Sequence, residues 1–218
     1  MNEKFFTLSK ERQQAILNAG YRVFSQNTYK KCPVSEIAAA AGISKSLLFY
    51  YFRNKKELYL YLWENCVKTT IKYMNDYHCY EQTDLFEMLR RGMQAKIRIM
   101  YEYPDIGLFA VKAFYEKDPE VADDIQKSYN RFKNLDAKDA LEKVDPRQFR
   151  EGLNIQMIYR EMYLAAEGYL WEMLRPGHID TKKMKQDFTE MIEFWKQIYL
   201  RNPEPVPHPD IHNRKEET

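Results

Sequence analysis

Hydrophobic residues along this chain recur at spacings of three and four, which is the repeat of helices that bury one face. The repeat is clearest over residues 86–100, 153–173 and 188–198. No run of four or more residues alternates between polar and apolar as a half-buried strand does. The pattern predicts an all-α protein of about nine helices, with three or four at the N-terminus and a larger helical body after them.

Capping residues and prolines indicate where several helices begin and end. Asn54–Glu57 has the pattern of a capping box, with the asparagine as N-cap and the glutamate three residues later. Asp118-Pro119 combines a cap with a proline at the first helical position, and Asp145–Gln148 repeats that signal with a capping box. We expect Asp145–Gln148 to open a long helix that ends at Pro176-Gly177, and a last helix to begin near Asp180.

Residues 34–55, VSEIAAAAGISKSLLFYYFRNK, have the layout of two short helices joined by a tight turn. Gly42 follows the first helix, where a left-handed backbone conformation is needed and glycine adopts it without strain. Ser44 can cap the second helix, Lys45–Phe52, by accepting a backbone hydrogen bond. This layout is typical of a helix-turn-helix, whose second helix enters the major groove of DNA.

Composition excludes several classes of protein. A hydrophobic content of 44% over 218 residues is enough for a sizeable core, and only 7 glycines favour long helices over a turn-rich β fold. No run of about 18 apolar residues and no apolar leader is present, so we expect a cytoplasmic protein without a transmembrane helix. The three cysteines lack metal-ligand spacing and fit thiols in a reducing compartment.

The charge of the chain is unevenly distributed. Residues 1–65 hold ten Lys or Arg and five Glu, a net charge of +5, so the remaining residues carry −3 of the total of +2. A basic N-terminal unit on a mildly acidic body fits a protein that holds DNA by one end. Residues 202–218 consist of proline, charged and polar residues, and we expect this tail to be disordered.

Residues 9–60, about a quarter of the chain, resemble the TetR family of bacterial transcriptional regulators. The stretch Glu36–Lys45 follows the family pattern E-I-A-x-x-A-G-V-S-K, and Leu48–Lys55 follows the pattern L-Y-Y-Y-F-x-x-K. Ile16, Ala19 and Phe24 match the first-helix pattern with looser spacing. Leu47 departs from the family, which often has a small or polar residue there.

The resemblance implies a bacterial protein with a three-helix DNA-binding domain at residues 1–54. It also implies a helical effector-binding and dimerisation domain at 55–201, followed by the tail at 202–218. Lysines and serines near the second helix of the motif could hold phosphates, and Leu47 could touch a thymine methyl. Adjacent tyrosines on a helix differ in direction by about 100°, so at least one of Tyr50 and Tyr51 must point outward. The expected DNA-binding residues are Val34, Ser35, Ser44, Lys45, Ser46, Leu47, Tyr50, Tyr51 and Lys55.

The resemblance further implies an effector pocket in the body, where flexible Met and flat aromatic residues suit a hydrophobic or aromatic ligand. The same residues at helical spacing are also what ordinary core packing requires. Glu161 or Glu167 could face a cationic ligand, although a solvated helix face is the more usual setting for a glutamate. The expected pocket residues are Met93, Ile97, Met100, Phe109, Phe114, Tyr115, Met157, Met162, Tyr163 and Glu167.

In the family layout, the last two helices pair with their copies in a homodimer. The apolar stripes of these helices fit that role, although packing within one chain would explain them too. Two-fold symmetry would set the recognition helices one or more DNA turns apart, about 34 Å, and predicts a palindromic operator. The expected interface residues are Tyr169, Met173, Phe188, Met191, Trp195 and Ile198.

The sequence thus predicts a ligand-responsive, homodimeric DNA-binding regulator, of which a repressor is the commonest kind. It offers no catalytic triad, phosphate loop or zinc motif, so we expect neither an enzyme nor a bound cofactor or metal. The alternatives are a TetR-like activator, or a DNA-organising protein without a small-molecule effector. A helical enzyme would need clustered ionisable residues in the body, and a purely structural dimer would leave the basic N-terminal unit unexplained.

Overall fold

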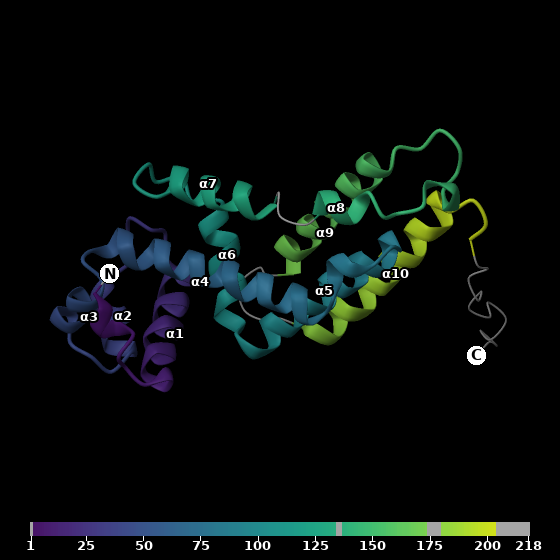
Figure 1. Ribbon diagram of the computed structural model, residues 1–218. Coiled ribbons are helices and arrows are strands. Elements are labelled where there is room, and N and C mark those ends of the chain that lie inside the picture. Colours follow the sequence, from purple (N-terminus) through teal and green to yellow (C-terminus); the bar gives the residue numbers. More distant parts are fainter. Residues whose placement is uncertain (1, 134–136, 174–179, 204–218) are drawn as a thin grey trace, which may run out of the picture.

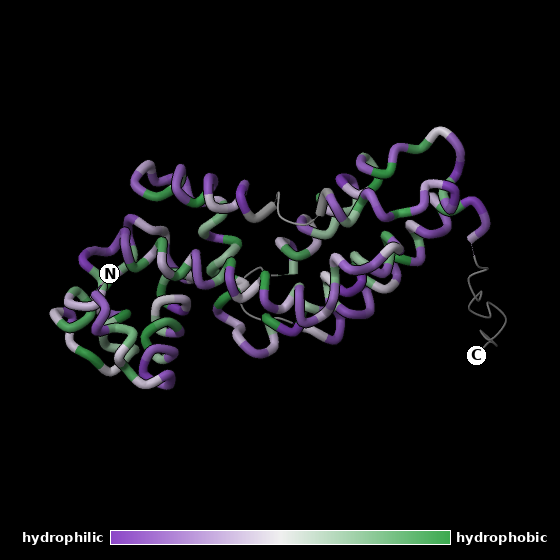
Figure 2. The backbone as a smooth tube through the Cα atoms, viewed as in Figure 1, coloured by the Kyte–Doolittle hydropathy of each residue, from purple (hydrophilic) through white to green (hydrophobic). Residues whose placement is uncertain are grey.

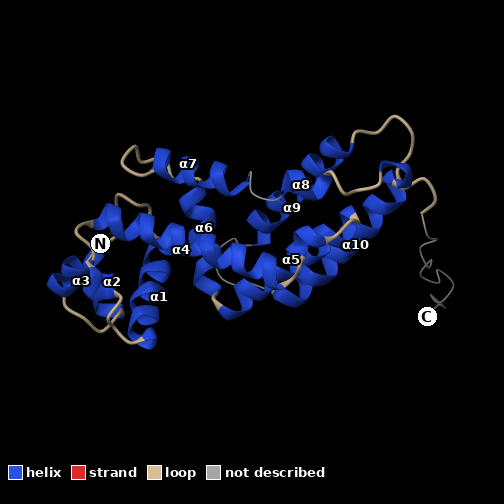
Figure 3. Ribbon diagram, viewed as in Figure 1, coloured by secondary structure: helices blue, strands red, loops and turns tan. Residues whose placement is uncertain are grey.

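The computed structural model describes residues 2–133, 137–173 and 180–203, and these are almost entirely helical (Figures 1 and 3). The predicted all-α fold is confirmed: within those ranges the sole β feature is an isolated bridge between Phe149 and Leu200. The α-helices are α1 (Lys10–Gln26), α2 (Val34–Ala40), α3 (Lys45–Tyr51), α4 (Lys55–Asp76), α5 (Leu85–Glu102), α6 (Pro104–Phe114), α7 (Ala122–Lys133), α8 (Ala137–Leu141), α9 (Ile155–Met173) and α10 (Thr181–Tyr199). Three short 3-10 helices, η1 (Glu3–Phe5), η2 (Cys79–Glu81) and η3 (Pro146–Gln148), lie between them.

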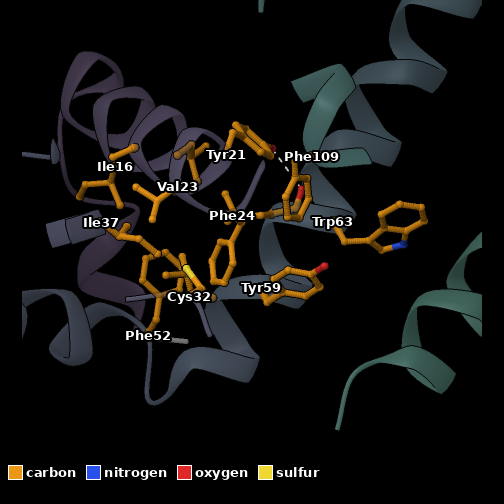
Figure 4. Close-up of a cluster of buried hydrophobic side chains, with 14 of the residues drawn as sticks. Ile16, Tyr21, Val23, Phe24, Cys32, Ile37, Phe52, Tyr59, Trp63 and Phe109 are labelled. Carbon is orange, nitrogen blue, oxygen red and sulfur yellow. Dashed lines mark hydrogen bonds between the residues drawn. The ribbon is translucent and has the colours of Figure 1, made fainter. Parts of the chain in front are cut away.

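Helices α1, α2 and α3 form the N-terminal unit at one end of the elongated molecule (Figure 1). Their contacts are made by fully buried side chains, among them Ile37 of α2, Leu48 of α3 and Phe52 just after it (Figure 4). Phe5 of η1 closes the unit from outside, with its ring 5.0 Å from that of Phe52. Leu48 and Phe52 lie one turn apart and have no exposed surface, which leaves the opposite side of α3 to solvent.

Two glycines make this packing possible. Gly42 has φ of +67°, which confirms the left-handed turn expected between α2 and α3. Gly20 lies on α1 where α4 crosses it, and a Cβ there would lie 2.7 Å from Cδ1 of Leu62. Since Leu62 is fully buried and cannot retreat, the two helices can approach this closely only at a glycine.

The N-terminal core continues into the body without a break. The first half of α4 contributes Leu58, Tyr59 and Leu62 to the same buried cluster as α1, and α6 contributes Phe109 (Figure 4). The Phe109 ring lies 5.2 Å from both Tyr21 and Tyr59, centroid to centroid. The domain boundary expected after residue 54 therefore coincides with the start of α4, and one buried cluster extends across it.

The rest of the body is a second cluster built from α5, α9 and α10. Hydrophobic and hydrophilic residues alternate along these helices, as amphipathic packing requires (Figure 2). Helices α9 and α10 run antiparallel, because Tyr169 donates to Asp187 at 2.9 Å while Tyr199 donates to Glu161 at 2.9 Å. Asp180 caps α10 by accepting from the N–H groups of Lys182 and Lys183, which confirms the expected start of that helix.

Two expected helix starts are wrong. Asp118 accepts the N–H of Glu120 and forms only a turn, and α7 begins at Ala122. The Asp145–Gln148 signal produces the single turn η3, and α9 begins at Ile155, after Gly152 with φ of +80°. The chain leaves the helical path there because residues 148–150 pair with the end of α10: Arg150 N–H donates to Tyr199 O at 3.0 Å.

Some expectations fall outside the described residues. The helix end at Pro176-Gly177 lies in 174–179, and all but the first two residues of the expected tail lie in 204–218. Among the helices that the structure describes, none combines the length and apolarity needed to cross a membrane.

Candidate functional site

The exposed face of α3 carries most of the residues expected to bind DNA. Ser44, Lys45 and Ser46 are exposed at the start of the helix, and Tyr50 is exposed one turn later, with 52% of its surface accessible. Ser35 is exposed at the start of α2, while Val34 and Leu47 are half-buried against the core. Hydroxyl, ammonium and phenol groups on one helix face are the donors that phosphates and base edges accept from.

Tyr51 is not available to DNA. It is buried, its ring lies 5.9 Å from that of Phe5, and its backbone oxygen accepts from Asn2 N–H at 2.9 Å. The helix turns by about 100° per residue, so placing Tyr50 outward places Tyr51 in the core. Tyr50 is therefore the outward member of the pair, and the expectation for Tyr51 is wrong.

Lys55 has structural partners of its own. Its Nζ donates to the backbone oxygen of Lys30 at 3.1 Å and lies 4.6 Å from the centroid of the Tyr29 ring. These contacts hold the loop between α1 and α2 against the start of α4. Lys45 has no such tie to the backbone and extends from the first turn of α3, 5.9 Å from the Phe49 ring.

Ser44 offers a way to separate folding from DNA contact. Its Oγ accepts the N–H of Leu47 at 3.1 Å and so caps α3. Ser44→Asp keeps an equally good cap, whereas Ser44→Ala loses about 1 kcal/mol of stability. We expect Ser44→Asp to unfold at the wild-type denaturant midpoint and yet bind duplex DNA at least roughly tenfold more weakly, because a carboxylate would face the phosphates.

Wild-type DNA affinity in Ser44→Asp, with its midpoint unchanged, would place the start of α3 away from the duplex. Ser44→Ala is the matched control. It lowers the midpoint and removes the hydroxyl without adding charge, so under folded conditions its affinity should fall clearly less than that of Ser44→Asp.

The body holds a partly open cavity of about 330 Å³, at the low end of the range typical of small-molecule sites, roughly 300–1,000 Å³. Its walls come from α4, α5, α6, α7 and α9, together with Tyr115 just after α6. The lining residues are mostly apolar or aromatic: Trp63, Cys66, Val67, Thr70, Lys96, Ile99, Met100, Ile106, Gly107, Ala110, Val111, Phe114, Tyr115, Tyr129, Tyr163, Leu164, Glu167, Leu170 and Trp171.

Half of the expected pocket residues line this cavity, namely Met100, Phe114, Tyr115, Tyr163 and Glu167. The other half do not. Phe109 faces α1 in the N-terminal core, and Met93, Ile97 and Met162 pack in the second core with α10. Met157 is exposed near the start of α9. Helical spacing identifies the apolar face of each helix but does not indicate which of two cores that face enters.

The sequence analysis missed the wall contributed by α4. Trp63, Cys66, Val67 and Thr70 line the cavity, at the spacing of one helix face. The signal that could have found this wall is the second apolar stripe of α4. Tyr129 of α7 and Trp171 of α9 were missed as well.

Polar groups in the cavity are few and mostly paired. Lys96 of α5 forms an ion pair with Glu167 of α9, and its Nζ lies 5.6 Å from the Tyr163 ring centroid. The hydroxyls of Tyr129 and Tyr163 lie 2.7 Å apart, so that one donates to the other. Burial raises the pKa of both phenols, which keeps them protonated at neutral pH.

The cavity lining includes one thiol, that of Cys66. Burial raises the pKa of the Cys66 thiol to about 12, so it is an unreactive protonated thiol. Over the residues that the structure describes, no three His, Cys, Asp or Glu side chains are grouped as a metal site would require.

The expected dimer residues separate into two groups. Phe188 and Trp195 are buried in the core of their own chain, so they cannot form an interface, and the expectation for them is wrong. Tyr169, Met173 and Met191 are half-buried against that core. Ile198 is 39% exposed, and Phe194, one turn earlier on the same face of α10, is 63% exposed.

The N-terminal unit is similar in sequence to known bacterial regulators. Residues 16–62 match the model of the family described as bacterial regulatory proteins, tetR family. Two curated relatives are the HTH-type transcriptional regulator AcrR of Shigella flexneri, 34% identical over 56 residues, and the uncharacterized HTH-type transcriptional regulator YhgD of Bacillus subtilis, 27% identical over 119 residues. These matches cover 26% and 50% of this chain, and 26% and 62% of the relatives' lengths.

Solved structures extend the likeness to the fold of the whole chain. A TetR family regulator from Chloroflexus aurantiacus has a TM-score of 0.61 at 22% identity, covering 92% of this chain and 99% of its own. SmeT of Stenotrophomonas maltophilia has a TM-score of 0.60 at 19% identity, with 90% and 96% covered. FadR of Bacillus subtilis has a TM-score of 0.59 at 16% identity, with 82% and 96% covered. The helix-turn-helix at residues 16–62 thus belongs to the tetR family of bacterial regulatory proteins, and the chain as a whole shares the fold of solved TetR family regulators.

Proposed function

We propose that this protein is a homodimeric transcriptional regulator, most simply a repressor in the bacterial cytoplasm. It binds a palindromic operator through α3 and leaves it when a small hydrophobic or aromatic effector fills the cavity. The observation that carries the proposal is the exposed face of α3, with Ser44, Lys45, Ser46 and Tyr50 held on a rigid, fully packed support.

The packing beneath α3 is rigid enough for a helix that recognises a DNA sequence. Leu48 and Phe52 anchor the helix with no exposed surface, and Ser44 fixes its first turn. A recognition helix must present its side chains in one geometry, because each good bidentate contact with a base discriminates by about 1–3 kcal/mol only when aligned. The basic N-terminal half supplies the salt-dependent attraction to phosphate.

A route from the cavity to the DNA-binding unit runs through α6. One side of this helix lines the cavity with Ile106 and Ala110, and Phe109 on another side packs into the core with α1. At its ends, Asp105 pairs with Arg22 of α1 at 3.5 Å, and Glu116 accepts Tyr29 N–H at 2.7 Å. A ligand that shifts α6 or α4 would therefore change the position of α1, which packs against both.

The free energy needed for such a switch is set by the populations involved. To convert a protein that is mostly bound into one that is mostly free, the effector must favour the released state by about 4–6 kcal/mol. Burying a compact apolar ligand in a cavity of about 330 Å³ supplies free energy of that order, if the cavity fits the ligand in only one state.

Two of the structurally similar proteins are consistent with this proposal. SmeT is described as the repressor of the multidrug efflux pump SmeDEF, and FadR of Bacillus subtilis was crystallised in complex with stearoyl-CoA. The alternative, an activator or DNA-organising protein without an effector, gives no role to the cavity. An enzyme is disfavoured because TetR-family members are DNA-binding regulators.

The homodimer is proposed to form through the exposed apolar residues of α9 and α10. Phe194 and Ile198 lie on one face of α10, and Met157 and Leu164 lie seven residues apart on α9. Exposed apolar side chains in such numbers are typical of an interaction surface. Ile198 was among the expected interface residues, and Phe194 was not.

Placing two carboxylates on this face should abolish the dimer. We expect the double variant Phe194→Glu and Ile198→Glu to sediment as a monomer at concentrations where the wild type is a dimer, because four like charges would meet at the interface. Lys185→Glu is the control, since this exposed residue lies about 180° around the same helix. An unchanged dimer in the double variant would place the interface elsewhere.

Selection from a library of random duplexes tests DNA recognition. The full chain should enrich a palindrome whose half-sites are centred one or more helical turns apart, about 10 bp or a multiple. Failure to enrich any sequence would contradict the proposal.

A further inference from the structure

One wall of the cavity carries a buried polar group that has no partner. Trp63 is 5% exposed, and in the described parts of the chain no acceptor lies within hydrogen-bond distance of its Nε1. Its indole projects from α4 away from the cluster of Phe24, Tyr59 and Phe109 (Figure 4). An indole N–H can only donate, so a molecule that completes this site must present an acceptor to it.

The ion pair across the cavity is unequal in its exposure. The Lys96 side chain is 23% exposed and that of Glu167 is 41% exposed. Lys96 also lies beside the Tyr163 ring, where its charge gains cation–π stabilisation. Displacing Glu167 into solvent is therefore easier than displacing Lys96, so the cation is the fixed member of the pair and the carboxylate is the exchangeable one.

This asymmetry bears on the charge of the ligand. A cationic ligand would have to compete with Lys96 for Glu167, and removal of that ammonium from its site would be opposed. An anionic ligand would replace the Glu167 carboxylate at Lys96, and the displaced side chain would find water. Donors of this kind, one ammonium and one unpartnered indole N–H, match the oxygens of a carboxylate or a neighbouring carbonyl.

The remaining surface defines the rest of the ligand. Aromatic rings make up much of the lining, with Phe114, Tyr115 and Tyr163 among them, and the Tyr115 ring lies 4.7 Å, centroid to centroid, from Trp171 at a tilt of 58°. Flat rings pack well against such walls. The volume of about 330 Å³ matches a compact ligand body.

We propose that the cavity binds a compact, aromatic or cyclic monocarboxylate, whose carboxylate pairs with Lys96 in place of Glu167 and which offers an oxygen to Trp63 Nε1. This inference rests on the proposed effector site and specifies its ligand class. It also corrects the expectation that Glu167 would face a cationic ligand, because in the structure Lys96 neutralises that carboxylate.

Three probes of equal shape and different charge test the proposal by calorimetric titration of the full chain: naphthoate, naphthamide and naphthylmethylammonium. We expect naphthoate to bind roughly tenfold more tightly than naphthamide, and the ammonium probe to bind most weakly. In Lys96→Met the preference of carboxylate over amide should disappear while amide binding persists. In Glu167→Gln, which removes the competing carboxylate, naphthoate should bind more tightly than it does to the wild type.

Trp63→Phe examines the second contact. It should weaken naphthoate and naphthamide alike, by roughly two- to tenfold, because both carry an oxygen acceptor. Trp171→Phe is the matched control, since Trp171 lines the same cavity but is partly exposed, and it should weaken both probes less. Each variant is accepted only if its thermal unfolding remains cooperative, and Lys96→Met and Glu167→Gln decide the matter if Trp63→Phe does not fold.

The outcomes separate this inference from the proposed function. Tighter binding of the amide or the ammonium probe would overturn the monocarboxylate assignment and leave an effector cavity in place. A carboxylate preference that survives in Lys96→Met would also overturn it. If none of the three probes binds at millimolar concentration, both the proposed ligand class and the effector role of the cavity are wrong. The proposed DNA recognition is tested separately, by selection of the operator.

Discussion

Phe109→Ala is expected to lower the free energy of unfolding by about 3–5 kcal/mol, as measured by urea denaturation. Phe109 has no exposed surface, and its ring contacts Tyr21 and Phe24 of α1 and Tyr59 of α4. Its removal leaves a cavity between three helices that cannot collapse without breaking other contacts. Since α6 reaches the DNA-binding unit through this ring, the variant should also show a less cooperative transition.

Phe114→Ala provides the comparison, because it removes the same side chain from the same helix. Phe114 is half-buried and lines the cavity, so its loss should cost clearly less stability and should alter ligand binding more. Equal losses of unfolding free energy in the two variants would contradict the assignment of Phe109 to the core that joins α6 to α1 and α4. So would a Phe109→Ala protein of unchanged stability with altered ligand binding, which is the result that the sequence-based pocket predicts.

The double variant Lys45→Ala and Tyr50→Ala is expected to bind the operator at least about a hundredfold more weakly than the wild type. Each protomer would lose a charge-assisted hydrogen bond and an exposed phenol, and a dimer loses both twice. Both residues are exposed, so the unfolding midpoint should change little. The slope of log affinity against log salt should also fall, by about 0.9 for each phosphate contact removed.

Lys185→Ala is the control for the charge alone. It removes one exposed lysine from α10, outside the DNA-binding unit, and should leave both affinity and salt slope unchanged (Figure 1). If the Lys45 and Tyr50 double variant binds as tightly as the Lys185 control, α3 is not the reading helix. Lys55→Ala would be a poor test, because Lys55 holds the Lys30 carbonyl and its loss would disturb the fold.

The helix-turn-helix could be predicted from sequence because its signals are local. Gly42 and Ser44 determine the turn and the cap through their own backbone and side-chain chemistry, and the structure has both where expected. Spacing along α3 also predicts that one of two adjacent tyrosines faces outward, but not which one. The contact of Tyr51 with Phe5, 46 positions earlier in the chain, decides that, and no local pattern contains it.

The start of α9 shows how a distant contact overrides a local signal. Asp145 does cap a turn, since it accepts the Arg147 N–H at 2.9 Å. The helix does not continue, because Arg201 N–H donates to Gln148 O at 2.9 Å and ties this segment to the end of α10. Those partners lie about fifty residues apart, beyond the reach of any capping rule.

Burial explains why the expected cavity and dimer residues were only partly right. Met162 and Phe188 have the apolar spacing of an interface or a pocket, yet both face the core shared by α5, α9 and α10. A helix in a two-core protein can bury two stripes, and α4 and α6 do so. The stripe that lines a cavity differs from the one that fills a core only in what lies opposite, which is a property of the tertiary structure.

The most direct test of sequence-specific DNA recognition is a fluorescence anisotropy titration. The full chain is titrated onto the selected palindrome and onto a scrambled duplex of equal composition. At physiological salt we expect the palindrome to bind at least about a thousandfold more tightly, with two protomers per site and an affinity that falls steeply as salt rises. Equal affinity for both duplexes would show that α3 contacts phosphates without reading bases, and would contradict a sequence-specific regulator.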